Sequence, residues 1–218
     1  MGAFLVVGLG NPGIEYQFTP HNAGFLAIDR IADNYSVAVA NRRCRALTAK
    51  VRMAGRDVIL AKPETFMNLS GISVGALVDE FDLEFVDNSP RNLLVLYDEL
   101  DLPLGTLRVR ERGSPAGHNG ARSISGVLGT DEWARIRMGV GPSPRRAGAP
   151  GTPSEPGAPE GMRRGRDYLL TPMSKRDLAA IDPVLDRVAR AVETVAAQGI
   201  SAAMNEFNRR DETDLGGK

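Results

Sequence analysis

One histidine, one aspartate and three asparagines are the side chains of this chain that could do chemistry together. Each is expected where a strand ends or a helix begins, which is where α/β sheets gather their ligands. A neutral imidazole takes a proton from water when a carboxylate fixes its other nitrogen, and amides hold a carbonyl oxygen without adding charge. The set suits hydrolysis of an activated ester: Asn11, His21, Asn68, Asp98 and Asn119.

Metal and cofactor chemistry have little support in the composition. Two histidines far apart in the chain and one cysteine give no recognisable metal-ligand spacing, so we expect neither a metal nor a cofactor. The lone Cys44 excludes an internal disulfide, and nothing indicates an oxidising compartment. Amide cleavage suits the set less well than ester cleavage, because no nucleophile is evident.

Two familiar motifs occur without the context that they need. Residues 8–13 match the G-x-G-x-x-G pattern of dinucleotide-binding folds, but Pro20 and Gly24 oppose the helix that should open inside these glycines. Residues 71–75 match the G-x-S-x-G pattern of serine hydrolases, and Asp98 and His118 follow in that triad's chain order. Ser73, however, falls inside a helical repeat rather than on a tight turn. Since neither motif has the context that it needs, we reject both interpretations.

Residues 4–34 are expected to position His21. The run FLVV at 4–7 is apolar without alternation, typical of a strand buried on both faces. Thr19 can cap a helix in which Pro20 is the first residue, and apolar residues then recur at helical spacing. His21 would thus lie in the first helical turn beside Asn11, where the helix N-terminus favours a neutral ring.

Alternating strands and helices predict a single-domain α/β fold: a mixed, mostly parallel twisted sheet with helices on both faces. We assign residues 1–210 to this domain, with a disordered Pro/Gly-rich insertion at 142–166 and a polar tail at 211–218. Strands are expected at 36–40, 46–53, 58–61, 93–97, 106–110 and 136–140. Helices are expected from residues 71 and 118, at 174–198 with a break at Pro183, and at 202–207.

Positive and negative side chains balance at 27 each, but the basic ones gather in two sets. A neutral protein with one basic face can still hold a polyanion, although scattered solvated arginines are the alternative. No membrane-spanning run or signal peptide is evident, so we expect a cytoplasmic protein. The first basic set is Arg42, Arg43, Arg45, Lys50, Arg52 and Arg56; the second is Arg108, Arg110, Arg112, Arg122, Arg135 and Arg137.

Five motifs, in order, resemble those of the bacterial peptidyl-tRNA hydrolase family. They are VGLGNPGIEY at 7–16, TPHN at 19–22, TFMNLSG at 65–71, DELDLPLG at 98–105 and GHNG at 117–120. The resemblance runs from Leu5 to about Gly141 and resumes from Tyr168. It implies a monomeric, cofactor-free enzyme that cleaves the ester between peptide and tRNA, binding the acceptor stem, the 3′ end and the attached peptide.

The resemblance also implies a role for each matching residue. His21 matches the base that activates water, Asp98 the carboxylate that orients it, and Asn11 the residue that separates N-blocked from free aminoacyl-tRNA. Other matches contact tRNA or peptide: Tyr16, Phe66, Met67, Asn68 and Asn119, with Arg110 and Arg137 at the positions of basic residues that meet tRNA phosphates.

The chain departs from the family pattern at three places. Pro20 stands where the family usually has Arg, residues 114–116 are stiffer than the usual Gly-rich loop, and the 142–166 insertion is longer. None of these removes a proposed catalytic group. Because relatives in plant organelles serve in RNA splicing on the same fold, an RNA-binding protein without turnover is the alternative.

Overall fold

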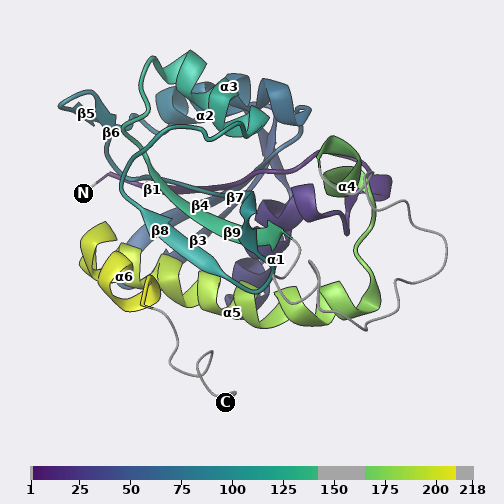
Figure 1. The fold of residues 1–218 in the computed structure, drawn as a ribbon. Coiled ribbons are helices and arrows are strands. Elements are labelled where there is room, and N and C mark those ends of the chain that lie inside the picture. Colours follow the sequence, from purple (N-terminus) through teal and green to yellow (C-terminus); the bar gives the residue numbers. More distant parts are fainter. Residues whose placement is uncertain (1, 142–164, 210–218) are drawn as a thin grey trace, which may run out of the picture.

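The computed structural model describes residues 2–141 and 165–209 (Figure 1). Seven strands form one sheet in the order β2-β3-β4-β1-β7-β9-β8. The four central strands run parallel: β4 (Arg56–Pro63), β1 (Phe4–Gly8), β7 (Leu93–Pro103) and β9 (Ala134–Gly141). The outer strands pair antiparallel: β2 (Asn41–Arg43), β3 (Ala46–Met53) and β8 (Leu107–Arg110).

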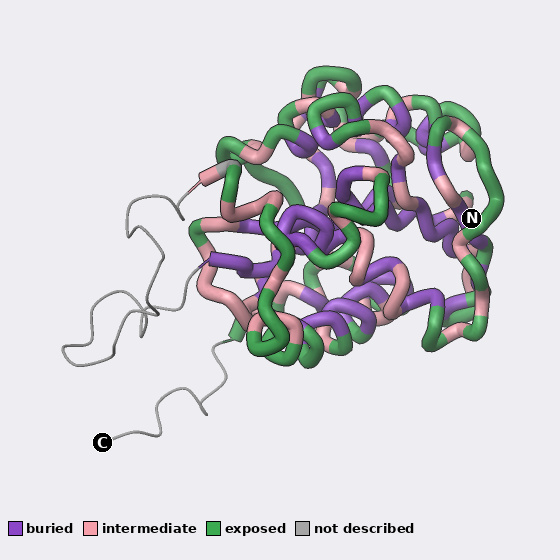
Figure 2. The backbone as a smooth tube through the Cα atoms, turned by 90° about the vertical axis from the view of Figure 1, so that its right-hand side faces the viewer, coloured by how far each residue is buried: buried purple, intermediate pink, exposed green. Residues whose placement is uncertain are grey.

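Helices cover both faces of the sheet, which confirms the expected fold class (Figure 1). Helices α2 (Ser70–Glu80) and α3 (Asn119–Leu128) lie on one face, and α1 (Ala23–Asn34), α5 (Lys175–Gln198) and α6 (Ile200–Phe207) lie on the other. Figure 2 shows the buried residues gathered between these layers. Within the described ranges, no helix is long and apolar enough to cross a membrane.

Several short elements complete the described fold. Three are 3₁₀ helices: η1 (Ile14–Tyr16), η2 (Pro20–Asn22) and η3 (Met67–Leu69). The others are the short helix α4 (Arg166–Leu170) and the two-stranded pair of β5 (Phe85–Val86) and β6 (Ser89–Pro90).

The strand predicted at 36–40 is wrong. Ser36 takes a positive φ of 53°, and the backbone N–H of Val37 donates to the carbonyl of Ala32 at 3.0 Å, so this segment closes helix α1. Val37 and Val39 pack against the core without pairing in the sheet. The alternation of apolar residues therefore reflects packing beneath the sheet rather than a strand.

Three other expectations need adjustment. His21 lies in η2, one turn before α1, rather than in an α-helical turn. Strand β7 continues past Asp98 to Pro103, with a register shift after Glu99. Helix α5 runs through Pro183 without a break, because its buried face continues on both sides of that exposed proline.

Most of the predicted insertion lies outside the described residues, which resume at Gly165, and so does the predicted tail at 211–218. The domain boundaries therefore stay predictions.

Candidate active site

Two glycines let the turn that carries His21 approach the centre of the sheet. A Cβ at Gly8 would lie 2.1 Å from the carbonyl oxygen of Gly24. A Cβ at Gly24 would lie 2.4 Å from both the Leu9 nitrogen and the Leu96 oxygen. No side chain fits at such distances, so only glycine allows the start of α1 to touch β1 and β7. This contact places η2 over the strand that carries Asp98.

Asp98 accepts hydrogen bonds from both histidines of the chain. Its Oδ1 lies 2.9 Å from His21 Nδ1 and 2.9 Å from His118 Nε2, and its Oδ2 lies 3.1 Å from His21 Nδ1. The carboxylate is 1% exposed. The two imidazole rings lie 5.1 Å apart, and Tyr97 packs against the His118 ring at 4.7 Å. The sheet, η2 and the start of α3 thus meet at one buried carboxylate.

The hydrogen bonds fix which ring nitrogens carry protons. His118 is the N-cap of α3, and its Nδ1 accepts from the backbone N–H of Ala121 at 3.1 Å. That nitrogen therefore presents its lone pair, and the proton lies on Nε2, which donates to Asp98. His21 donates from Nδ1 to the same carboxylate, so its Nε2 carries the free lone pair. His21 is therefore arranged as a base.

The ionisation of Asp98 follows from its neighbours. Burial alone would raise the pKa of this carboxyl, but His118 and His21, which point at its oxygens, outweigh burial and hold the pKa well below its usual range. The stabilisation from these pairs is complete above the ordinary carboxyl pKa of about 3.9 and is lost only as the pH falls through the lower native value. Asp98 is therefore a carboxylate at neutral pH.

A second cluster holds Asn11 beside this site. The backbone N–H of Asn11 donates to Asn22 Oδ1 at 2.9 Å, and Asn22 Nδ2 donates to the Asn11 carbonyl at 3.0 Å. Asn11 Oδ1 accepts from the backbone N–H of Met67 at 2.8 Å. The side-chain oxygen is thus occupied, whereas Nδ2 has no hydrogen-bond partner among the described residues. Asn11 presents a donor, not an acceptor.

The remaining predicted contacts lie on elements around these two clusters. Met67 is buried at the start of η3, and a Cβ at Gly120 would lie 2.5 Å from its sulfur, so η3 packs against the start of α3. The other predicted peptide or tRNA contacts are at least partly exposed: Tyr16 at the end of η1, Phe66 and Asn68 at η3, and Asn119 at the start of α3.

The histidine pair has the spacing, but not the hydrogen bonds, of a metal site. One ligand atom from each of His21, Asp98 and His118 lies within 4.8 Å of the others, so the fold brings together two histidines that are far apart in the chain. A metal on His118 Nε2 would displace its proton while Nδ1 still accepts from Ala121, which requires an imidazolate or a broken helix cap. The arrangement favours proton sharing.

The serine-hydrolase alternative also fails on contacts. Ser73 is buried inside α2, and its hydroxyl donates to the Cys44 carbonyl at 2.8 Å. The histidines are instead hydrogen-bonded to Asp98. The dinucleotide pattern fails similarly, because two 3₁₀ helices, rather than an α-helix, follow the glycines.

Known proteins match the chain over nearly its whole length. A profile of the peptidyl-tRNA hydrolase family matches residues 5–214. The chain belongs to this family. The peptidyl-tRNA hydrolase of Acidobacterium capsulatum is 62% identical over 208 residues, 95% of this chain and 96% of that protein, and that of Koribacter versatilis is 48% identical over 95% and 94%. The crystal structure of peptidyl-tRNA hydrolase from Acinetobacter baumannii superposes with a TM-score of 0.79 at 29% identity, covering 95% of each chain.

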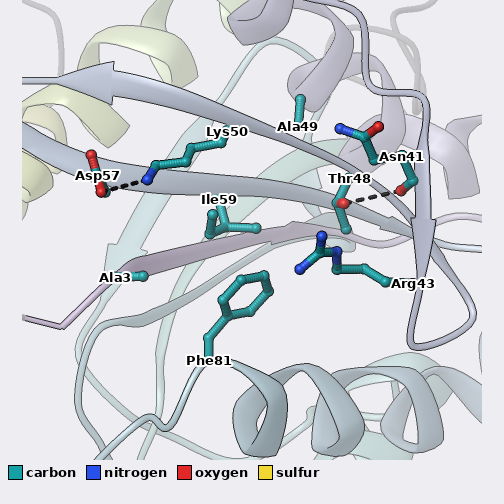
Figure 3. Close-up of a pocket in the computed structure, with 9 residues that line it drawn as sticks. All are labelled: Ala3, Asn41, Arg43, Thr48, Ala49, Lys50, Asp57, Ile59 and Phe81. Carbon is teal, nitrogen blue, oxygen red and sulfur yellow. Dashed lines mark hydrogen bonds and ion pairs between the residues drawn. The ribbon is translucent and has the colours of Figure 1, made fainter.

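Nearby carboxylates neutralise most side chains of the first basic set. Carboxylates lie within 3.3 Å of four of its side chains, in the pairs Arg42–Glu64, Arg43–Glu80, Lys50–Asp57 and Arg52–Asp57. Figure 3 shows part of it around a cavity of about 300 Å³, where Arg43 lies over the ring of Phe81. The cavity lies near the amino ends of β1 and β4, away from His21.

The second basic set divides differently. Arg108, Arg110 and Arg122 pair with no carboxylate among the described residues. Arg112 is paired with Glu132 at 3.0 Å, and Arg137 is paired with Glu99 at 3.0 Å, next to Asp98 in β7. Arg135 is not a surface residue: it is 1% exposed and donates to backbone carbonyls at 131, 133 and 114.

Sequence reasoning missed His118 and Asn22 as site residues. Both stand inside the matched motifs, and His118 is one of only two histidines. Because the chain has only two histidines, the presence of the second one in a matched motif could have marked it as a site residue. Nothing local indicated that the second histidine would bond the same carboxylate as the first, because 77 residues separate His21 from Asp98.

Proposed function

We propose that the chain hydrolyses the ester joining a peptide to the 3′-terminal ribose of tRNA, and so recycles tRNA from peptidyl-tRNA. The observation that carries this proposal is the buried His21–Asp98 pair at 2.9 Å, in a chain of the peptidyl-tRNA hydrolase family. An imidazole with a free Nε2 suits an ester, whose alkoxide leaving group departs more readily than the unprotonated nitrogen of an amide.

In this proposal His21 Nε2 takes a proton from water, and the resulting hydroxide attacks the ester carbonyl carbon. The tetrahedral intermediate collapses with cleavage of the carbon–oxygen bond to the ribose, and His21 returns its proton to the departing hydroxyl. The products are tRNA and the carboxylic acid of the peptide, which loses its proton to solvent. Asp98 keeps the Nδ1 proton in place and stabilises the imidazolium formed in between.

Asn11 is proposed to select the blocked substrate. Because Met67 occupies its Oδ1, only the Nδ2 donor is left for substrate. That donor can bond the carbonyl of an N-acyl group, whereas the ammonium of a free aminoacyl ester offers only donors. Selection of peptidyl-tRNA over aminoacyl-tRNA follows from this polarity.

Release of N-acetylaminoacyl groups from tRNA by the wild-type chain tests the proposal, with the same tRNA carrying a free aminoacyl group as control. We expect release from the blocked ester only. Equal release from both would remove Asn11 from its proposed role, and release from neither would overturn the proposed activity.

Asn68→Ala is expected to lower kcat on the order of 10²–10³-fold if this amide holds the developing oxyanion. Asn68 is exposed on η3, directly after Met67, which Asn11 fixes. Steady-state kinetics on N-acetylaminoacyl-tRNA separate the outcomes. A higher KM with kcat unchanged would make Asn68 a binding residue instead.

The second basic set is proposed to hold the tRNA acceptor stem. Arg110 lies at the end of β8 without a carboxylate partner, and Arg137 lies on the same face of the sheet, diagonally across β9. In the part of the chain that the structure describes, Arg108 and Arg110 are in no ion pair and so bind phosphates at a lower cost than Arg137, which must first leave its ion pair with Glu99. The first set, with four of six side chains paired, is the poorer candidate.

Arg110→Ala is therefore expected to weaken tRNA binding and to reduce the slope of log affinity against log salt by about 1. Arg42→Ala is the matched control, because Arg42 is exposed but paired with Glu64 at the opposite edge. Binding titrations at several salt concentrations give both slopes. An unchanged slope for Arg110→Ala would remove it from the tRNA surface.

One chain supplies every group used above, in keeping with the proposed monomer and with a cytoplasmic site of action beside the ribosome. Both stay predictions. The alternative is an RNA-binding protein that shares the fold without turnover, and tRNA binding without ester release would favour it.

A further inference from the structure

Asn208, just beyond helix α6, bonds the outer edge of strand β8. Its Oδ1 accepts from the backbone N–H of Val109 at 2.8 Å, and its Nδ2 donates to the Val109 carbonyl at 2.9 Å. The amide thus makes the two bonds that a neighbouring strand would make. Figure 1 shows α6 beside this end strand of the sheet.

These bonds lie in the middle of β8, the strand that carries Arg108 and Arg110. In the antiparallel pairing of β8 with β9, Arg108 lies opposite Arg137 and Arg110 opposite Arg135, and Val109 stands between the two arginines. Val109 directs its side chain into the core and its backbone groups outward to Asn208. A four-residue edge strand with open backbone groups frays readily, and Asn208 closes that edge.

The two hydrogen bonds of Asn208 are separable from the packing of α6. Ala203 and Phe207 are buried and attach the helix to the core, whereas Asn208 lies after the last helical residue. Removing the amide leaves those apolar contacts in place. Loss of Asn208 should therefore loosen β8 without releasing the helix.

We propose that Asn208 is a positioning residue for substrate: it holds β8 so that Arg108 and Arg110 meet tRNA phosphates in a fixed arrangement. The inference rests on the proposed function. It assigns to the C-terminal segment a part in recognising the acceptor stem, acting through β8 rather than by touching RNA.

Asn208→Ala and the control Asn205→Ala, at an exposed position inside α6, test this on two substrates. One is full-length N-acetylaminoacyl-tRNA, and the other is the same ester on a 3′-terminal CCA trinucleotide, which lacks the acceptor stem. Loss of two neutral hydrogen bonds should raise KM for the full-length substrate about 5- to 10-fold with kcat unchanged. The short substrate and the Asn205→Ala control should stay within about 2-fold of wild type.

Equal losses on both substrates would show a merely structural role, and no loss on either would also overturn the inference. If Asn208→Ala does not fold, the neutral Asn208→Gln keeps both polar groups but displaces them by one methylene, and it should give an intermediate KM increase confined to the full-length substrate. A wild-type chain that hydrolyses neither substrate would refute the proposed function. An active wild type with an unaffected Asn208→Ala would refute this inference alone.

Discussion

Asp98→Asn is expected to slow ester hydrolysis about 10⁴-fold, as loss of a triad carboxylate does, while the fold is kept. The reason is the proton arrangement. His118 must donate from Nε2, because Ala121 holds its Nδ1, so the new amide turns its oxygen toward His118. The amide nitrogen then takes the Oδ2 position, 3.1 Å from His21 Nδ1, where it donates in the tautomer that carries the His21 proton on Nε2. The amide oxygen, 2.9 Å from both rings, has lost the negative charge that favoured a proton on Nδ1, so the tautomer able to take a proton from water is disfavoured.

Single-turnover release from N-acetylaminoacyl-tRNA measures this effect, with Asp101→Asn as the matched control. Asp101 is an exposed carboxylate three residues further along the same strand. The control should retain wild-type rates, and both variants should bind tRNA as the wild type does. A loss of less than about 10-fold in Asp98→Asn would contradict the proposed tautomer.

His21→Ala is expected to lower kcat by about 10²–10⁴-fold with KM little changed, because it removes the general base but no group assigned to tRNA binding. The residual rate would come from the asparagine side chains of the site and from the orientation of the bound substrate. Steady-state kinetics on N-acetylaminoacyl-tRNA separate kcat from KM.

His118→Asn is the informative comparison for that variant. Asparagine is a good helix N-cap, so α3 should keep its start, and only the second bond to Asp98 is lost. We expect a much smaller loss than in His21→Ala. Equal losses would mean that the proton relay needs both imidazoles, or that His21 is not the base.

Local sequence signals predicted much of the fold because they act over short range. The apolar run of β1, the strand at 46–53 and the helix at 174–198 were all readable from residue type and spacing. The prediction at 36–40 failed because Val37 and Val39 show strand-like alternation, which packing of a loop against the core also produces. The break at Pro183 failed because packing on both sides of the proline outweighed its local cost.

The site was predicted less completely, because its contacts join distant segments. The residue types of His21, Asp98 and Asn11 were informative. Two features instead depend on the close approach of η2 to β7: the carboxylate that both histidines share, and the hydrogen bonds by which Asn22 holds Asn11. The sequence alone predicted two basic sets of six residues each, without indicating which of their side chains are paired with carboxylates. Only the structure shows that carboxylates pair four members of the first set and two of the second, Arg112 and Arg137, and that Arg135 of the second set is buried.

The most direct test of the central claim is multiple turnover of N-acetylaminoacyl-tRNA by wild type and His21→Ala, with tRNA binding measured in the same preparations. The account predicts that the wild type releases many equivalents of blocked amino acid per chain, and that His21→Ala binds tRNA equally well but releases little. Tight tRNA binding by both proteins, with release at the uncatalysed rate, would contradict it and favour the RNA-binding alternative.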